Sequence, residues 1–393
     1  MMNDVVNIDD LRKLAKRRLP KIAYDYVEGG TDDEAALLTN LQAFRRTRVI
    51  PRYLVDVSVR DQSTVLFGRT YSSPIGIAPT GLAGLLRPGA DIMLAQAARD
   101  ANVPFIMSGV STGSIEDLGK VAPDHGWYQL YSSKDPSISE DMIKRASDAG
   151  LRTLVFTVDV PESSNRERDL RNGWRRPLKL TWKTKFEALR HPAWMMQWLQ
   201  HGAPYFDNWT KYAGPNASVE QVADLVANQC RAPMTWKHVE RYRELWKGNF
   251  VIKGIMHPDD AVRAHSLGVD GIIVSNHGGR QLDNAPSPLE MLPRIRDVVG
   301  DNMTVMLDSG IRRGLDVLIA ICMGAQFVFQ GRPTLYGVTA GGVAGAAKAL
   351  AIFRREIDIS MAQMGVSSIA DLGRHHLMWK DNEDWRSNRR EET

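Results

Sequence analysis

The stretch FVIKGIMHPDDAVRAHSLGVDGIIVSN, residues 250–276, contains two short apolar runs separated by a helical pattern. The runs FVIKG (250–254) and GIIVSN (271–276) are continuously apolar until they end in glycine or polar residues. Such runs are typical of parallel strands buried on both faces. The segment between them has helical periodicity and a glycine near its end. The stretch therefore predicts one strand–helix–strand unit of a parallel sheet.

The same unit recurs along the whole chain. Eight apolar runs, each followed by a helix-like segment, are PIGIAP (74–79), VPFIMS (103–108), GWYQLY (126–131), TLVFTVD (153–159), FVIKG (250–254), GIIVSN (271–276), TVMLDS (304–309) and FVFQGR (327–332). This number of units predicts an α/β fold, the (β/α)8 TIM barrel. Residues 1–50 are expected to form an N-terminal helical cap. A doubly wound sheet is the alternative, but no glycine fingerprint follows the first run.

The composition is that of an ordinary globular protein, with 43% apolar and 24% charged residues. A formal net charge of +4 over 393 residues predicts no nucleic-acid partner. Two cysteines, Cys230 and Cys322, make a disulfide framework improbable and fit a reducing compartment. The N-terminus lacks the apolar stretch of a signal peptide. No window approaches 18 uncharged apolar residues, so we expect no membrane-spanning helix.

The spacing of the runs is regular except after the fourth, where residues 160–249 form a long insertion. Its middle, residues 177–215, holds four of the ten tryptophans, with five Lys/Arg against two Asp/Glu. Aromatic side chains interleaved with cations are typical of an interfacial membrane anchor rather than a span. We therefore expect one domain, residues 1–393, with an internal membrane-binding insertion at 177–215. A solvated loop with incidental aromatics is the alternative.

The carboxyl ends of the runs predict the site, because working residues of such barrels lie at that face. The ends carry polar side chains or glycine at Pro79, Thr80, Gly81, Ser108, Gln129, Tyr131, Thr157, Asp159, Lys253, Ser275, His277, Asp308, Gly310, Gly331 and Arg332. DSGIRRG (308–314) and QGRPT (330–334) predict a phosphate site, where backbone N–H groups meet an anion. Lys253 at a strand end favours a flavin with an electron-rich edge, and a Schiff-base lysine is the rival interpretation.

At this point the chain resembles a family, the FMN-dependent enzymes that oxidise L-2-hydroxy acids. The resemblance runs from about residue 8 to 375 and rests on SNHGGRQLD (275–283), TVDVP (157–161), KGI (253–255), LDSGIRRG (307–314), GRPTLYG (331–337), YQLY (128–131) and YDYVEGG (24–30). It implies FMN as the cofactor, and no metal is expected, because the remaining histidines have no metal-ligand spacing.

The resemblance also implies roles for residues. His277 is implied to be the catalytic base and Asp159 its partner, while Arg280, Arg166, Tyr26 and Tyr131 are implied to hold the substrate. Lys253 is implied to face the flavin N1/O2 edge, and Asp308, Arg312, Gly331 and Arg332 to fix the ribityl phosphate. The chemistry agrees, because two guanidiniums can clamp a carboxylate and a histidine steadied by a carboxylate can remove a proton near neutral pH.

The acceptor and the location follow from the insertion. Members that oxidise mandelate, and the bacterial respiratory lactate dehydrogenases, carry a similar insert. This resemblance implies a peripheral enzyme on the cytoplasmic face of the cell inner membrane, which passes electrons to a membrane quinone and forms a homo-oligomer, a tetramer in the family. Gly81, where oxidases of the family tend to carry alanine, is expected to disfavour oxygen as the acceptor.

The substrate is predicted from the side-chain pocket, which the family pattern puts near Gly81, Val110, Ser163 and Met256. Val110 and Ser163 are smaller than the Trp and Leu of glycolate-oxidising members, which leaves room for a bulky group at C2 and favours a mandelate-like acid. The alternatives are an L-lactate dehydrogenase using quinone, an oxygen-using 2-hydroxy-acid oxidase, an FMN-dependent isomerase of isoprenoid diphosphates, and a barrel kept only as a membrane-binding module.

Overall fold

The eight apolar runs form a closed parallel barrel in the order β10-β11-β4-β5-β6-β7-β8-β9. A computed structural model describes residues 2, 4–173, 182–230 and 234–378. The barrel strands are β4 (Ile75–Ile77), β5 (Phe105–Ser108), β6 (Gly126–Leu130), β7 (Thr153–Thr157), β8 (Asn249–Ile255), β9 (Gly271–Val274), β10 (Thr304–Leu307) and β11 (Phe327–Gln330). The prediction of a (β/α)8 barrel is therefore confirmed, with each strand within its predicted run or, for β8, reaching one residue beyond it at each end.

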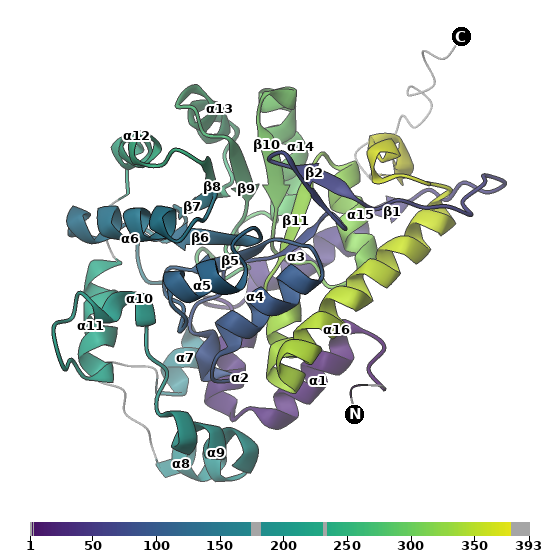
Figure 1. The fold of residues 1–393 in the computed structure, drawn as a ribbon. Coiled ribbons are helices and arrows are strands. Elements are labelled where there is room, and N and C mark those ends of the chain that lie inside the picture. The colour runs from purple at the N-terminus through teal and green to yellow at the C-terminus, as the bar shows by residue number, and fades with distance from the viewer. Residues whose placement is uncertain (1, 3, 174–181, 231–233, 379–393) are drawn as a thin grey trace.

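A helix follows each strand, and all of these helices except the short one after β7 cover the outside of the barrel (Figure 1). These helices are α4 (Ala90–Asp100), α5 (Ile115–Val121), α6 (Pro136–Asp148), α7 (Glu167–Arg171), α13 (Pro258–Ser266), α14 (Pro288–Val299), α15 (Gly314–Cys322) and α16 (Arg332–Met364). Many begin at a capping residue; Ser287, for example, caps α14 with a reciprocal bond to Glu290. The helices pack against the outside of the strands to form the outer core, while a second cluster, rich in aromatic residues, fills the barrel interior.

The amino-terminal end of the barrel is closed by a hairpin of β2 (Thr64–Leu66) and β3 (Arg69–Tyr71). Leu66, Phe67 and Tyr71 of this hairpin pack against Trp127 and Phe329 inside the barrel. The plug leaves the carboxyl ends of the strands as the open end. There the N-terminal cap lies, formed by α1 (Ile8–Arg18), α2 (Lys21–Glu28) and α3 (Ala35–Arg46). A short antiparallel pair, β1 (Arg48–Val49) and β12 (Leu377–Met378), joins the segment after α3 to the segment that follows α16.

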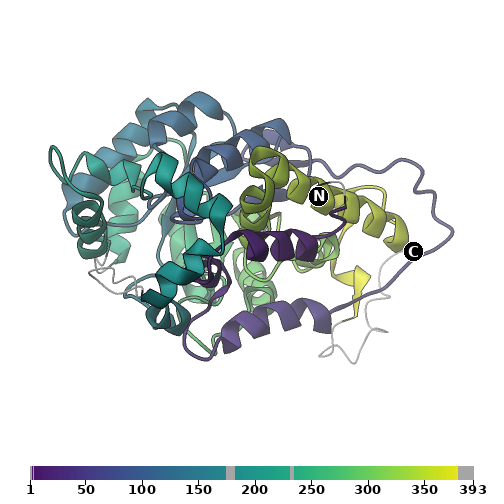
Figure 2. The same cartoon turned by 90° about the horizontal axis from the view of Figure 1, so that it is seen from below.

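Helix α16 is long and apolar enough to cross a membrane by length and composition, which differs from the expectation that no segment would be. However, 61% of its most apolar window is buried inside the protein. It breaks at Gly341 and Gly342, whose backbone angles are not helical. One side packs against α1 and α4, as Figure 2 shows from below. Its apolar residues therefore serve the outer core of the barrel.

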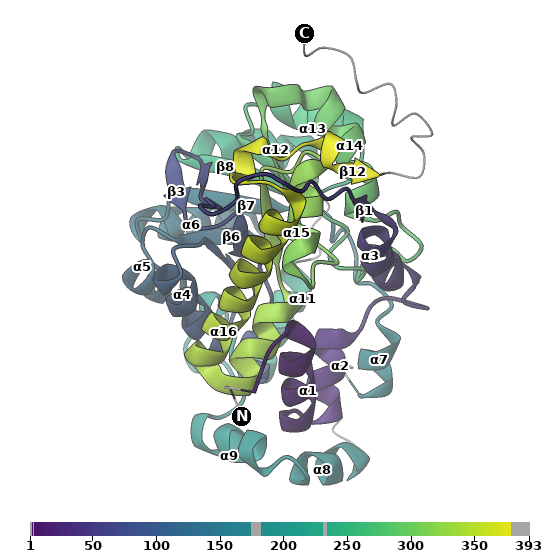
Figure 3. The same ribbon diagram turned by 90° about the vertical axis from the view of Figure 1, so that its right-hand side faces the viewer.

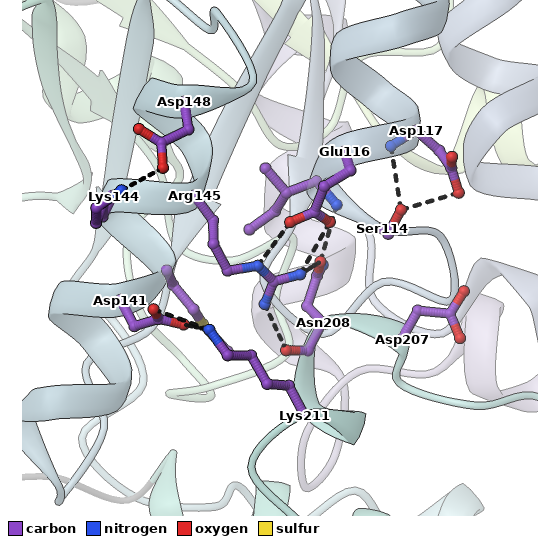
Figure 4. A network of polar contacts seen from close by, with 12 residues as sticks. Ser114, Glu116, Asp117, Asp141, Lys144, Arg145, Asp148, Asp207, Asn208 and Lys211 are labelled. Carbon is purple, nitrogen blue, oxygen red and sulfur yellow. Dashed lines mark hydrogen bonds and ion pairs between the residues drawn. The ribbon is translucent and has the colours of Figure 1, made fainter.

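The insertion between β7 and β8 contains α8 (Trp182–Leu189), α9 (Pro192–His201), α10 (Asp207–Thr210), α11 (Val219–Gln229) and α12 (Trp236–Leu245). Helix α10 is fastened to the barrel wall. Trp209 is 1% exposed and donates to the Gly109 carbonyl at 2.8 Å. Asn208 accepts from the Ile115 amide, and Arg145 bridges the Asn208 carbonyl to Glu116 (Figure 4). Residues 207–212 are thus part of the barrel body.

By contrast, α8 and α9 form a hairpin that projects from the molecule beside α1 and α2 (Figures 1 and 3). Its exposed apolar side chains are Trp182, Phe186, Leu189, Met196 and Leu199. Trp194 is instead buried, with its indole N–H on the Leu85 carbonyl at 2.8 Å. The prediction treated residues 177–215 as one aromatic anchor; residues 177–181 lie outside the described residues, and Trp194 and Trp209 are core residues. Within the described part of residues 177–215, the exposed large apolar side chains are those of the α8–α9 hairpin.

Candidate active site

A cavity opens at the carboxyl ends of the barrel strands, where the sequence predicted the site. Its lining includes these predicted residues: Tyr26, Pro79, Thr80, Gly81, Tyr131, Arg166, Lys253, His277, Arg280, Asp308, Gly310, Arg312, Gly331 and Arg332. The other predicted residues lie just behind this lining and are Ser108, Gln129, Thr157, Asp159 and Ser275. One cavity therefore brings together residues from the ends of all eight barrel strands and from the cap.

The loop after β9 adopts a rare backbone conformation. His277 has φ of 57°, and Gly278 and Gly279 follow at 68° and 74°. A Cβ at Gly279 would lie 2.6 Å from the Leu37 amide nitrogen, so the cap packs directly on this glycine. A non-glycine residue at positive φ is strained and persists where the surroundings hold it. Here the amide of His277 donates to Ser275 Oγ at 3.1 Å.

His277 and Asp159 form a buried pair, with 2.8 Å between Nδ1 and Oδ1. Burial lowers the pKa of the imidazole more than Asp159 raises it. Burial would raise the pKa of the Asp159 carboxyl, but His277 and Lys253 outweigh it and the pKa lies below its usual value. The pair is therefore a carboxylate and a neutral imidazole near neutral pH. Because the carboxylate accepts at Nδ1, Nε2 is left as an unprotonated acceptor.

Arg280 and Arg166 line the same side of the cavity. Arg280 donates through Nη1 to the carbonyls of Tyr26 at 2.8 Å and Gly29 at 2.7 Å. Arg166 donates to Gln281 Oε1 at 3.0 Å. Within the described residues, neither guanidinium has a carboxylate within ion-pair distance. Burial, then the charges of Arg166 and Arg332, lower the pKa of Arg280 to about 9, so two unneutralised cations face one cavity, a suitable place for an anion.

Two tyrosines border this cationic side. Tyr26 Oη donates to the Gly81 carbonyl at 3.1 Å, and the Arg280 guanidinium carbon lies 5.3 Å from the centre of its ring. Burial raises the pKa of both Tyr26 and Tyr131. Both therefore keep their hydroxyl protons at physiological pH and can act as hydrogen-bond donors.

Lys253 is 3% exposed and paired with carboxylates. Its Nζ lies 2.8 Å from Ser275 Oγ, 3.2 Å from Asp308 Oδ2 and 3.8 Å from Asp159 Oδ2. Burial would lower its pKa, but Asp308 and Asp159 raise it above the usual value. A Schiff-base lysine must lose its proton, so this environment argues against that alternative. Asp308 is a charge partner of Lys253 here rather than a neighbour suited to a phosphate.

The polar groups below the cavity match a heteroaromatic ring such as the FMN isoalloxazine. Within the described residues, Gln129 Nε2 and Thr157 Oγ1 are buried and have no hydrogen-bond partner. Gln129 Oε1 is in contrast held by Ser108 Oγ at 3.2 Å and the Gly109 amide at 3.2 Å. Buried polar groups are rarely left unpaired. The amide donor of Gln129 and the hydroxyl of Thr157 therefore fit a ligand that has both acceptor and donor edges.

The other end of the cavity suits a phosphate. Gly331 precedes α16 with no side-chain cap, so the first amides of this helix are free for an anion. Gly310 has φ of 89°, and a Cβ there would lie 2.5 Å from the Asn40 carbonyl oxygen. Arg312 and Arg332 line the same end. Arg332 also binds the cap, donating to the carbonyls of Val27, Gly278 and Gly29. The residues present thus fit FMN along its whole length.

The apolar part of the cavity differs from the expected side-chain pocket. Ser163 is exposed, and neither it nor Met256 lines the cavity. Val110 does, together with Val160 and Cys230. The predicted pattern missed Cys230 because it comes from the insertion, at the end of α11. No local signal marks it; its place depends on Gln229, which accepts hydrogen bonds from Ser133 Oγ, Lys134 N and Asp135 N after β6.

Known proteins resemble this chain over nearly its full length. Residues 15–379 match the family model for FMN-dependent dehydrogenase. The chain is 39% identical to the (S)-mandelate dehydrogenase of Pseudomonas putida, with 96% of this chain and 95% of that protein aligned. It is also 39% identical to an L-lactate dehydrogenase of Xanthobacter autotrophicus, with coverages of 94% and 95%. A crystal structure of the monotopic membrane protein (S)-mandelate dehydrogenase superposes with a TM-score of 0.92 at 38% identity, covering 96% of this chain and all of that one. The chain therefore belongs to the FMN-dependent dehydrogenase family.

Proposed function

We propose that this protein oxidises a mandelate-like L-2-hydroxy acid to the 2-oxo acid and passes the electrons to a membrane quinone. The proposal is carried by one observation: a neutral imidazole, His277, faces the same cavity as two guanidiniums, Arg280 and Arg166, which have no carboxylate partner among the residues that the structure describes. A 2-hydroxy acid offers both a carboxylate and a removable proton at the spacing of one carbon. FMN, the cofactor of the family, supplies the two-electron acceptor for such a substrate when it is bound.

In this mechanism the cationic side binds first. Arg280 and Arg166 hold the substrate carboxylate through charge-assisted hydrogen bonds, and the Tyr131 hydroxyl donates to the substrate's oxygens. Nε2 of His277 then accepts the proton that the substrate releases. Asp159, at 2.8 Å from Nδ1, stabilises the imidazolium that forms. The buried Lys253 ammonium would supply a positive charge to the polar edge of FMN when the cofactor is bound.

The cofactor-binding role is proposed for the strand ends around that ring. Lys253, Gln129 and Thr157 would face the polar edge of the ring, and Gly310, Arg312, Gly331 and Arg332 would surround the phosphate. Their support is the unpaired amide and hydroxyl, the uncapped start of α16 and the two arginines at the phosphate end. Pro79, Thr80, Gly81, Ser108, Ser275 and Asp308 complete the proposed cofactor site.

A mandelate-like substrate is favoured by the apolar side of the cavity. Val110, Val160 and Cys230 offer no charge or amide to a substituent at C2, so they suit an aryl group better than a hydroxylated one. A lactate dehydrogenase is the second candidate, because a relative named for lactate is as similar to this chain as one named for mandelate.

Peripheral attachment to the cytoplasmic face of the inner membrane is proposed for the α8–α9 hairpin. Its five exposed apolar side chains, each worth about 1.5–3 kcal/mol when fully buried, would suffice to hold a protein on a bilayer. The similar (S)-mandelate dehydrogenase structure is that of a monotopic membrane protein. A homotetramer and a quinone acceptor complete the proposal.

The test is anaerobic reduction of the FMN-loaded enzyme by a panel of L-2-hydroxy acids, followed by a quinone. We expect mandelate to bleach the flavin faster than lactate, and a soluble quinone to restore its colour. Faster reduction by lactate would favour the second candidate, and no reduction by any 2-hydroxy acid would refute the proposal.

Vesicle sedimentation of wild type and of the double variant Phe186→Ser/Leu199→Ser separately tests the hairpin. Equal sedimentation of the two proteins would exclude the hairpin as the membrane anchor.

A further inference from the structure

Helix α2 is the element that both ends of the cavity share. Its Tyr26 side chain lines the cavity. The backbone carbonyls at its C-terminal end accept hydrogen bonds from the two arginines, Tyr26 and Gly29 from Arg280 and Val27 and Gly29 from Arg332. A displacement of α2 would therefore move the proposed carboxylate clamp and a proposed phosphate ligand together.

The N-terminus of α2 has no cap of its own. Pro20 occupies the N-cap position without a side-chain hydrogen bond, and the first turn has no acidic residue. The missing acceptor comes instead from the α8–α9 hairpin. Both carboxylate oxygens of Glu187 in α8 lie 2.8 Å from the Lys21 amide. A carboxylate at this end of a helix satisfies a free N–H and interacts favourably with the helix dipole.

His191 fastens this contact. Its Nε2 lies 3.3 Å from Glu187 Oε1, and its Nδ1 lies 3.1 Å from the Arg17 carbonyl oxygen of α1. Figure 3 shows α8 directly beneath α1 and α2. The hairpin is thus held against the cap by polar contacts, while five of its apolar side chains are exposed.

The second helix of the hairpin contacts the segment that follows Gly81. The indole N–H of Trp194 in α9 donates to the Leu85 carbonyl, four residues after Gly81. Gly81 in turn accepts the hydrogen bond from the Tyr26 hydroxyl at 3.1 Å. The hairpin therefore touches both segments that the Tyr26–Gly81 hydrogen bond joins.

We propose that Glu187 is a positioning residue, which caps α2 from the insertion and so holds Tyr26 and the partners of Arg280 in place for the substrate. The hairpin then has two roles on two faces, an outward apolar face and an inward polar face that completes the active site. The substrate part of this inference rests on the proposed function; the part concerning α2 rests on geometry alone.

The experiment compares Glu187→Ala and Glu187→Gln with wild type in the full-length, FMN-loaded enzyme. Amide hydrogen exchange of residues 20–28 reports the cap without any turnover. Loss of a helix cap should speed this exchange by roughly 3- to 30-fold in Glu187→Ala. Glu187→Gln keeps one acceptor oxygen and should fall between. Glu220→Gln, an exposed carboxylate of α11, is the matched control and should equal wild type.

The kinetic arm asks whether the cap serves the site. KM for the best 2-hydroxy acid should rise roughly 3- to 30-fold in Glu187→Ala while kcat stays within about twofold, because the clamp rather than His277 is disturbed. Trp194→Phe, which removes only the N–H donor, should raise KM in the same direction. Vesicle binding should remain unchanged in all variants, because their exposed apolar residues are intact.

The outcomes separate the two proposals. A wild type that no 2-hydroxy acid reduces would refute the proposed function, and exchange of residues 20–28 would still test the cap. A wild type that is reduced, with Glu187→Ala unchanged in both exchange and KM, would refute the positioning role. Faster exchange with an unchanged KM would reduce Glu187 to a purely structural cap and would also overturn the inference.

Discussion

Replacing Asp159 by asparagine changes one charge in the site and almost no volume. In the structure the carboxylate holds His277 Nδ1 at 2.8 Å and lies 3.8 Å from Lys253 Nζ. Asparagine could still touch the imidazole, but it would no longer stabilise the imidazolium that forms when Nε2 takes a proton. The perturbation therefore separates the charge of the partner from the shape of the site.

The magnitude follows from the charge that is lost. Two unit charges about 4 Å apart interact by about 4 kcal/mol at an effective dielectric constant of 20. A loss of about 3–4 kcal/mol in the transition state is therefore expected. That corresponds to roughly 10² to 10³ in the rate of flavin reduction. KM should change little, because Arg280 and Arg166 do not touch the substituted group.

The assay is anaerobic stopped-flow reduction of bound FMN, measured against pH. Because Asp159 raises the pKa of His277 while burial lowers it, the variant should have a still lower imidazole pKa. The pH at which acid begins to slow flavin reduction should therefore be lower in the variant, and the maximum rate at higher pH should be smaller. The FMN content of the variant must be checked, since Lys253 keeps only Asp308 as a carboxylate partner.

The control is Asp283→Asn, the same substitution on the loop that carries His277. Asp283 accepts from the Ala36 amide at 2.8 Å and so caps α3 instead of contacting the cavity. It should keep the wild-type rate with at most a loss of stability. A full rate in Asp159→Asn, or an equal loss in Asp283→Asn, would refute the charge argument.

Three further results are expected. Arg280→Lys keeps the charge but loses the two hydrogen bonds to carbonyls of the cap, so it should weaken substrate binding and slow flavin reduction, measured as a lower kcat/KM. Unchanged kinetics would show that the substrate carboxylate binds elsewhere. In Gly81→Ala the new Cβ would lie 2.7 Å from Val110 Cγ2, so the variant should alter both substrate KM and the rate of reoxidation by oxygen; two unaltered rates would rule out a role for this space. N-ethylmaleimide should label Cys230 and block oxidation of the 2-hydroxy acid, with protection by the 2-oxo acid, while Cys322 stays unlabelled because burial raises the pKa of its thiol to about 12. Labelling of Cys230 at the same rate with and without the 2-oxo acid would exclude it from the substrate pocket.

The barrel could be predicted because its signals are local. A strand buried on both faces must be apolar along its whole length, and GIIV became β9 (Gly271–Val274) with all four residues buried. Parallel strands bring their carboxyl ends to one face. The apolar runs that predict the fold therefore also predict which residues lie near His277 and Lys253. No knowledge of side-chain packing was needed for either inference.

The insertion could not be predicted in this way, because burial of a tryptophan depends on partners that are distant in the chain. Trp194 and Trp209 have the same composition signal as Trp182, but their N–H groups meet carbonyls of Leu85 and Gly109, about 100 residues earlier. A count of aromatic residues therefore overestimated the number of exposed aromatic side chains and did not reveal that one side of the insertion packs against the barrel and the cap.

The same limit explains the substrate pocket. Family spacing pointed to Ser163 and Met256, which follow β7 and β8 directly, because residues near strand ends are the natural candidates. Cys230 enters the cavity from the far end of the insertion, through hydrogen bonds of Gln229 to the loop after β6. An insertion that contributes a wall of the cavity and the cap of α2 is constrained by the active site as well as by any membrane. Its inward residues, Cys230 and Glu187, should therefore tolerate substitution less well than its outward residues, such as Phe186 and Leu199, when activity with a soluble acceptor is the measure.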